Sequence, residues 1–142
     1  GVTDVIDSAT ITHTAALLDG TGSGQANAFW KDQFSVPSGG SVALDLRALT
    51  HKAFGGTGTL ALSAAKMLVV QSTGAISFGA AVADRWAAFS AGAVSVGAGG
   101  VMYALAPASG WPVVSGASVV LITNAGTAPA VVDVYLVGVQ AT

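Results

Sequence analysis

Apolar residues in this chain come in short runs, and glycine, serine, threonine or proline interrupts each run after a few positions. The chain holds 19 glycines and 4 prolines, and turn signals recur about every 8 to 12 residues. A helix of useful length needs a long stretch with a 3.6-residue period, which the interruptions prevent. Despite abundant alanine, the β-branched runs and the even spacing of turns favour short strands.

The strand pattern predicts one all-β domain, an antiparallel β-sandwich of jelly-roll-like type with about eight to ten short strands. The last two strands are separated by a loop at residues 124–129 that is typical of a hairpin. We expect an N-terminal strand or arm at residues 1–17 and the sandwich at residues 18–142. Strands are predicted at residues 2–15, 33–36, 41–46, 59–62, 66–71, 75–78, 86–89, 93–96, 101–105, 117–123 and 130–139.

Residues 66–70 differ from the other strands, because Lys66 is followed by a continuous run of Met, Leu, Val and Val. Most antiparallel strands alternate apolar and polar residues, because one face meets the core and the other meets water. A continuous apolar run predicts a strand that is covered on both faces.

The chain carries very little charge. Only 12 of its 142 residues are Asp, Lys or Arg, and Glu is absent, whereas a soluble domain has about 25% charged residues. We therefore expect other protein, either copies of this chain or a larger assembly, to cover much of the surface. A net charge of −2 without a basic run argues against a nucleic-acid partner. The uncharged residues 86–132 are interrupted by proline and glycine, so we expect no membrane partner.

No sequence motif predicts catalysis, and the protein is not expected to be an enzyme. Cysteine is absent, and the two histidines, His13 and His51, are isolated, with His51 expected in a loop. The serine in residues 92–97 is not in a nucleophile elbow. The glycine-rich residues 20–24 lack the Gly-Lys-Ser ending of a phosphate loop and predict a flexible connection. The seven aspartates are scattered, so neither a metal nor a cofactor is expected.

The tryptophans are expected either in the core or at a subunit interface, where this residue type is enriched. The N-terminal segment alternates apolar and polar residues, so it can add a strand to the sheet edge of a neighbour. The candidate interface residues are Val2, Ile6, Ile11, Trp30, Trp86 and Trp111.

Several segments, taken in order, resemble a known group of virion proteins. They are residues 18–26 (LDGTGSGQA), 44–46 (LDL), 49–50 (LT), 54–55 (FG), 66–70 (KMLVV), 110–113 (GWPV) and 133–138 (DVYLVG). Over roughly residues 18–138 the chain resembles small Ala/Gly-rich proteins of tailed bacteriophages, described as head decoration or auxiliary capsid proteins. The resemblance implies a β-sandwich that binds a capsid lattice, and it brings no catalytic motif.

The expected function is therefore that of a virion structural protein that binds and stabilises the phage capsid from outside, after synthesis in the host cytoplasm. Its expected partners are the major capsid protein and itself, as a trimer, a number that follows from capsid symmetry and the resemblance. One alternative is a carbohydrate-binding or adhesin-like module of a virion fibre or cell surface, which needs exposed aromatic side chains. Another is a hydrolase built from scattered Asp and His, which needs a deep polar cleft.

Overall fold

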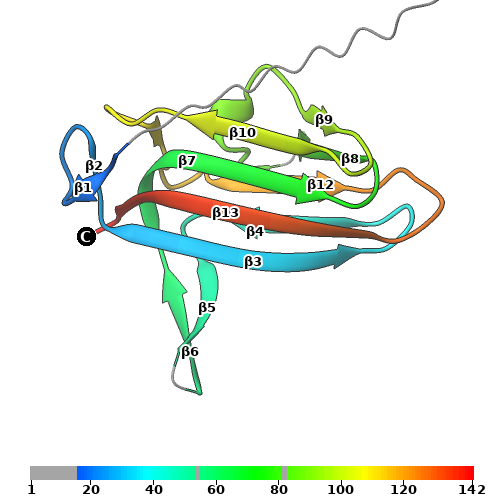
Figure 1. Cartoon of the computed structure of the whole chain (residues 1–142), viewed down its shortest axis with the longest axis horizontal. Coiled ribbons are helices and arrows are strands. Elements are labelled where there is room, and N and C mark those ends of the chain that lie inside the picture. The colour runs from blue at the N-terminus through cyan, green and yellow to red at the C-terminus, as the bar shows by residue number, and fades with distance from the viewer. Residues whose placement is uncertain (1–15, 54, 81–82) are drawn as a thin grey trace, which may run out of the picture.

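The computed structural model describes residues 16–53, 55–80 and 83–142, and their regular structure is almost entirely β (Figure 1). A single short 3-10 helix, Ala87–Phe89, is the exception among these residues. The strands are β1 Leu18–Asp19, β2 Gln25–Ala26, β3 Ala28–Val36, β4 Ser41–Asp45, β5 Leu49–Ala53, β6 Gly56–Leu60, β7 Leu62–Ser72, β8 Ile76–Ala80, β9 Val94–Val96, β10 Val101–Leu105, β11 Trp111–Pro112, β12 Val119–Thr123 and β13 Ala130–Gln140.

Two antiparallel sheets form the sandwich. The first, here called the β13 sheet, has the order β10-β7-β13-β3, and β11 also pairs with β7. The second, the β12 sheet, has the order β4-β12-β8-β9. Among these eight main strands only β8 and β9 are neighbours both along the chain and within a sheet. Such an eight-stranded double sheet, in which the chain keeps crossing between layers, is a jelly roll, so the predicted fold class is confirmed.

The core lies between the two sheets and is built from alternate residues of each strand. In β13 the buried residues Val132, Val134 and Leu136 face inward. In β12 the buried residues Val120 and Ile122 meet them from the opposite sheet. Because the side chains of a strand alternate between its faces, the intervening residues of the same strands face away from the core.

The predicted hairpin at residues 124–129 is wrong, because β12 and β13 belong to different sheets. Each of these strands buries one face, and the two buried faces meet across the core, so the connection has to cross from one layer to the other. Asn124 fixes this crossing: its side-chain amide donates hydrogen bonds to the carbonyl oxygens of Val36 and Ala128, at 3.1 and 2.7 Å.

The predicted strand at residues 86–89 is also wrong, since this segment forms the 3-10 helix. Trp86 and Phe89 are both buried, with ring centroids 5.7 Å apart. Residues three apart point to opposite faces of a strand but to the same side of a 3-10 turn. The helical turn therefore lets both rings enter the core, where Phe89 also packs edge-on against Phe78.

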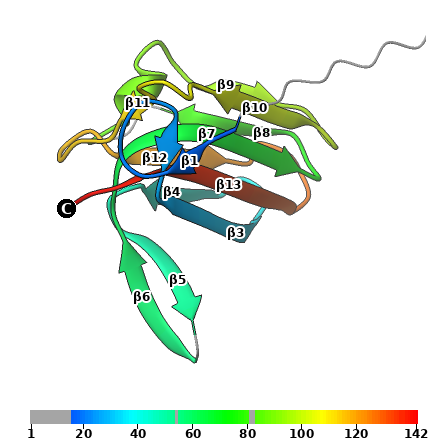
Figure 2. The same ribbon diagram turned by 60° about the vertical axis from the view of Figure 1, so that its left-hand side comes forward.

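The β5–β6 hairpin extends away from the two sheets (Figure 2). It contains His51, which was expected in a loop and lies in β5. Buried Leu49 anchors the hairpin to the core, and its neighbour Leu60 packs against the same cluster. The predicted strand at residues 2–15 lies outside the described residues, and the first described strand begins at Leu18.

Candidate interaction surface

The outer face of the β13 sheet carries rows of side chains that the strand register places side by side. In the first row, Leu105 of β10 pairs with Met67 of β7, which pairs with Val137 of β13, which pairs with Phe29 of β3. All four residues are apolar, and each comes from a different strand. The row therefore runs across the full width of the sheet.

The second row lies directly beside the first. It runs from Tyr103 through Val69 and Tyr135 to Lys31. The Lys31 ammonium lies 5.5 Å from the centre of the Tyr135 ring, a distance at which the cation is attracted to the ring face. This row joins two aromatic rings to the apolar row and ends in a cation at the edge strand.

The third row is polar apart from Val101, and it marks the border of the apolar region. It runs from Val101 through Gln71 and Asp133 to Gln33. The Gln33 side-chain amide donates a hydrogen bond of 3.0 Å to the Asp133 carboxylate. The apolar residues of the three rows are called the apolar face, and they are Phe29, Met67, Val69, Val101, Tyr103, Leu105, Tyr135 and Val137.

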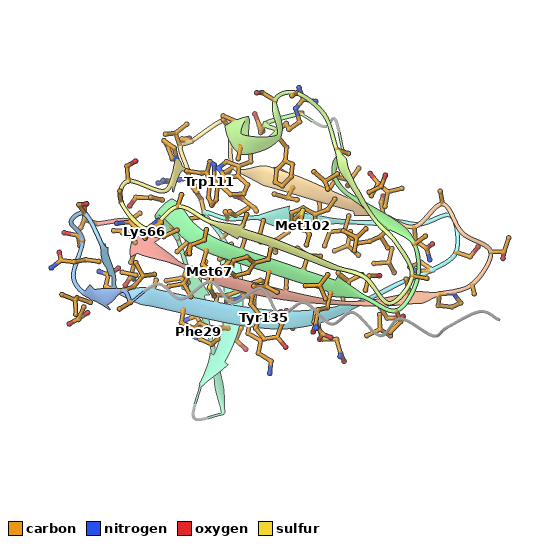
Figure 3. All side chains as sticks on the ribbon, turned by 45° about the horizontal axis from the view of Figure 1, so that its top comes forward. Phe29, Lys66, Met67, Met102, Trp111 and Tyr135 are labelled. Carbon is orange, nitrogen blue, oxygen red and sulfur yellow. The ribbon has the colours of Figure 1, made fainter. Side chains whose placement is uncertain are left out.

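The described part of the chain leaves the apolar face open to solvent. Phe29 is 64% exposed, Val101 56% and Tyr103 49%, and the other members are half-buried against one another. Figure 3 shows Phe29, Met67 and Tyr135 on this side of the sheet. The continuous apolar run at residues 66–70 is explained by this geometry, because β7 turns Leu68 and Val70 into the core and Met67 and Val69 onto the apolar face.

The three tryptophans do not belong to the apolar face. Trp30 and Trp86 are buried in the core, which was one of the two roles expected for them beside a subunit interface. Trp111 is half-buried and packs against the core. The ring N–H of Trp30 donates to the Thr50 carbonyl at 2.9 Å, and that of Trp86 to the Pro112 carbonyl at 2.7 Å. These bonds satisfy the polar atom of each buried ring. The other candidates, Val2, Ile6 and Ile11, lie outside the described residues.

Two of the scattered titratable residues meet beside β3 and β5. Asp32 and His51 line a pocket of about 370 Å³ together with Lys31 and Thr50. The Asp32 carboxylate accepts a hydrogen bond from the backbone N–H of Gln33 at 2.8 Å. Within the described ranges no group of three or more His, Asp, Glu or Cys side chains converges as a metal site would require. Nor do the described residues include a helix that is long and apolar enough to cross a membrane.

The sequence prediction missed every residue of the apolar face. The signal was present in β13, where Val131, Tyr135 and Val137 alternate with the core residues Val132 and Val134, so that the strand is apolar on both faces. It was also present in residues 66–70, which predicted a strand covered on both faces. The neighbouring residues on β3 and β10 become visible only once the strand order is known.

No family model matches the chain, and no curated protein matches it either. Among solved structures, the chain is similar to a de novo designed double-stranded β-helix whose structure was determined by NMR. The TM-score is 0.42 at 10% identity, and the alignment covers 75% of this chain and 97% of the designed one. The jelly-roll assignment of this chain rests on its own strand order.

Proposed function

We propose that this protein is a virion structural protein that attaches to the outside of a phage capsid lattice and stabilises it. The observation that carries the proposal is the apolar face, a broad outer surface without a cover among the described residues. The resemblance of the chain to head decoration proteins supplies the identity of the partner. Self-association, as a trimer, is part of the same proposal.

The energetic argument follows from the two-sided strands β7 and β13. One side of each strand is buried in the core, so folding of the single chain requires apolar residues on that side only. Covering the other side contributes about 1.5–3 kcal/mol for each large side chain that becomes fully buried. Phe29, Val101 and Tyr103 are the most exposed and have the most to gain. A protein that binds only the assembled shell then stabilises that shell by mass action.

The test is co-sedimentation of the full chain with undecorated heads, followed by heat or osmotic challenge of the heads. Val101→Asp places a charge on the apolar face, and Val114→Asp is its matched control, because Val114 is 51% exposed but lies outside that face. We expect Val101→Asp to abolish binding and protection and Val114→Asp to retain both. If both variants bind and protect as well as the unchanged chain, the apolar face is not the docking surface. If the unchanged chain neither binds nor protects, the decoration function is rejected.

The N-terminal residues 2–15 are proposed as a second contact, an arm that adds a strand to the edge of a neighbouring sheet. Deletion of residues 1–15 is expected to leave a folded sandwich, because the described strands begin at Leu18. The deleted protein should bind heads about tenfold more weakly, a loss of about 1.4 kcal/mol. Binding and protection at the level of the full chain would exclude the arm while leaving the apolar face in place.

A specific observation also favours the carbohydrate-binding alternative. Tyr103 and Tyr135 lie in one row, next to the amide and carboxylate groups of Gln71, Asp133 and Gln33. Aromatic rings beside such groups suit a sugar, which offers an apolar ring face and a rim of hydroxyls. A panel of polysaccharides distinguishes the two functions. The glycan-binding function is favoured if the chain binds a glycan, if Tyr103→Ala abolishes that binding, and if the chain does not attach to heads.

A further inference from the structure

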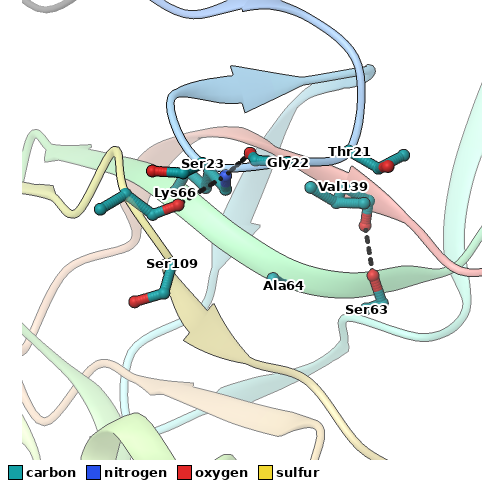
Figure 4. Close-up of a pocket in the computed structure, with 9 residues that line it drawn as sticks. Thr21, Gly22, Ser23, Ser63, Ala64, Lys66, Ser109 and Val139 are labelled. Atoms are coloured by element: carbon teal, nitrogen blue, oxygen red, sulfur yellow. Dashed lines mark hydrogen bonds between the residues drawn. The ribbon is translucent and has the colours of Figure 1, made fainter.

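We propose that Lys66 is the centre of a carboxylate-binding site at the end of the sandwich. Lys66 is only 2% exposed, and its ammonium donates to the carbonyl oxygens of Gly22 at 2.7 Å and Ala108 at 3.0 Å (Figure 4). An ammonium has three N–H donors and no acceptor. Two donors are used by these carbonyls, and the third remains for a ligand in the adjoining pocket.

A β-bulge places this lysine. Met67 pairs with Val137 of β13, but the next pair joins Ala65 to Gly138, so Lys66 is an extra residue without a partner on β13. Ala65 belongs to the core, whereas Lys66 is buried beneath the loops that carry Gly22 and Ala108, whose carbonyl oxygens it bonds. Bulges are frequent beside binding sites.

Two glycines keep the space that the bulge needs. A Cβ at Gly138 would overlap the carbonyl oxygen of Ala64. Gly110 has φ of +70°, and a Cβ there would lie 2.6 Å from the carbonyl oxygen of Ala65 and 2.9 Å from Cγ of Lys66. Any other residue at either position would push the backbone away from the bulge. The local structure is thus built around Lys66.

The pocket beside Lys66 measures about 340 Å³ and is rich in hydroxyl groups. Thr21 and Ser23 come from the glycine-rich loop before β2, Ser109 from the loop after β10, and Ser63 from β7. The Ser63 hydroxyl donates to the Val139 carbonyl at 3.3 Å. Figure 4 shows Lys66 between the loop that carries Ser23 and the loop that carries Ser109.

The charge balance identifies the ligand. In the described part of the chain both partners of the Lys66 ammonium are neutral carbonyls, so its buried positive charge lacks a counter-charge. Burying an ion is unfavourable unless an opposite charge compensates it. A carboxylate brings one negative charge and accepts hydrogen bonds from an ammonium and from hydroxyls. A phosphate dianion would exceed the single positive charge. The carboxylate can come from a free small molecule or from an Asp or Glu side chain of a neighbouring protein.

The test uses the isolated full chain, so its outcome is independent of capsid binding. Amide NMR shifts are followed while sodium acetate is added, with sodium chloride at the same ionic strength as the reference. We expect saturable shifts specific to acetate at Gly22, Ser23, Ala108 and Ser109. Lys66→Met should weaken acetate binding by about tenfold, the loss of one charge-assisted hydrogen bond. Lys31→Met, which removes an exposed lysine that does not line the pocket, should leave acetate binding unchanged.

Two further arms complete the test. The source of the carboxylate is identified with blocked aspartate, and blocked asparagine is the control. If blocked aspartate binds more tightly than acetate, the ligand is a protein side chain; if the two bind equally, it is a free small carboxylate. Identical shifts in acetate and chloride would overturn the proposal, and so would acetate binding that Lys66→Met leaves intact. If Lys66→Met does not fold, Ser109→Ala at the exposed rim is used instead, and a weaker acetate affinity is expected.

Discussion

The two sheets share one core, but their outer faces have opposite chemistry. The β13 sheet presents the apolar face. At a comparable position the β12 sheet presents a row of hydroxyl groups, in which Ser41, Thr123, Ser77 and Ser95 pair across all four strands. The single chain can fold with either kind of outer surface, apolar or hydroxyl-rich, because only the inner faces of the sheets form the core. The apolar face is therefore a feature that folding does not require.

The contrast is one of extent. Among its described side chains, the β12 sheet has larger apolar residues on its outer side only in β12, where Leu121 and Val119 are half-buried beside Ala43 and Asp45. On the β13 sheet such residues occur in all four strands. A continuous apolar surface of this kind is typical of a contact with another protein, whereas isolated surface leucines are common.

The largest expected effect is the difference in unfolding free energy between substitutions on the two sides of a single strand, β13. Leu136→Ala removes a fully buried side chain and should lower the free energy of unfolding by about 3 kcal/mol. Val137→Ala removes a side chain from the apolar face and should cost less than about 1 kcal/mol in the dissociated chain. Denaturant unfolding at low protein concentration measures both. Equal costs would mean that the chain itself already covers the apolar face.

A smaller effect is expected on self-association. Tyr103→Asp puts a carboxylate on the apolar face, in the edge strand β10, and should weaken association by about 2 kcal/mol, because the interface would bury an uncompensated charge. Ser95→Asp puts the same charge on the hydroxyl row of the other sheet and should leave association unchanged. Gel filtration with light scattering gives the masses. Equal dissociation by both variants would show that the faces do not differ in this role.

Local patterns explain why the fold class was predictable. The jelly roll follows from β-branched runs such as residues 130–139, which begin directly after a proline. The pairing of strands was not predictable in the same way, because the loop at residues 124–129 has the composition of a hairpin and the structure uses it to change sheets. Loop composition reports that the chain turns, whereas the sheet that it enters depends on contacts across the core.

The candidate sites depended even more on tertiary structure. The tryptophans attracted attention as large residues, yet Trp30 and Trp86 complete the core and bond to distant carbonyls. The apolar face brings together residues from positions 29 to 137, which no local window contains. Lys66 looked like the start of an apolar strand, and its burial beneath the loops of Gly22 and Ala108 is visible only in the tertiary structure.

The smallest effect is expected on the hydroxyl row. Ser95→Ala removes an exposed hydroxyl from the outer side of the β12 sheet. The free energy of unfolding should change by less than about 0.5 kcal/mol, as is usual for surface substitutions. Association should also stay unchanged, because the contact is expected on the opposite sheet. Denaturant unfolding and light scattering on the same samples check both. A loss of association here would place the contact on the hydroxyl row and reverse the roles of the two faces.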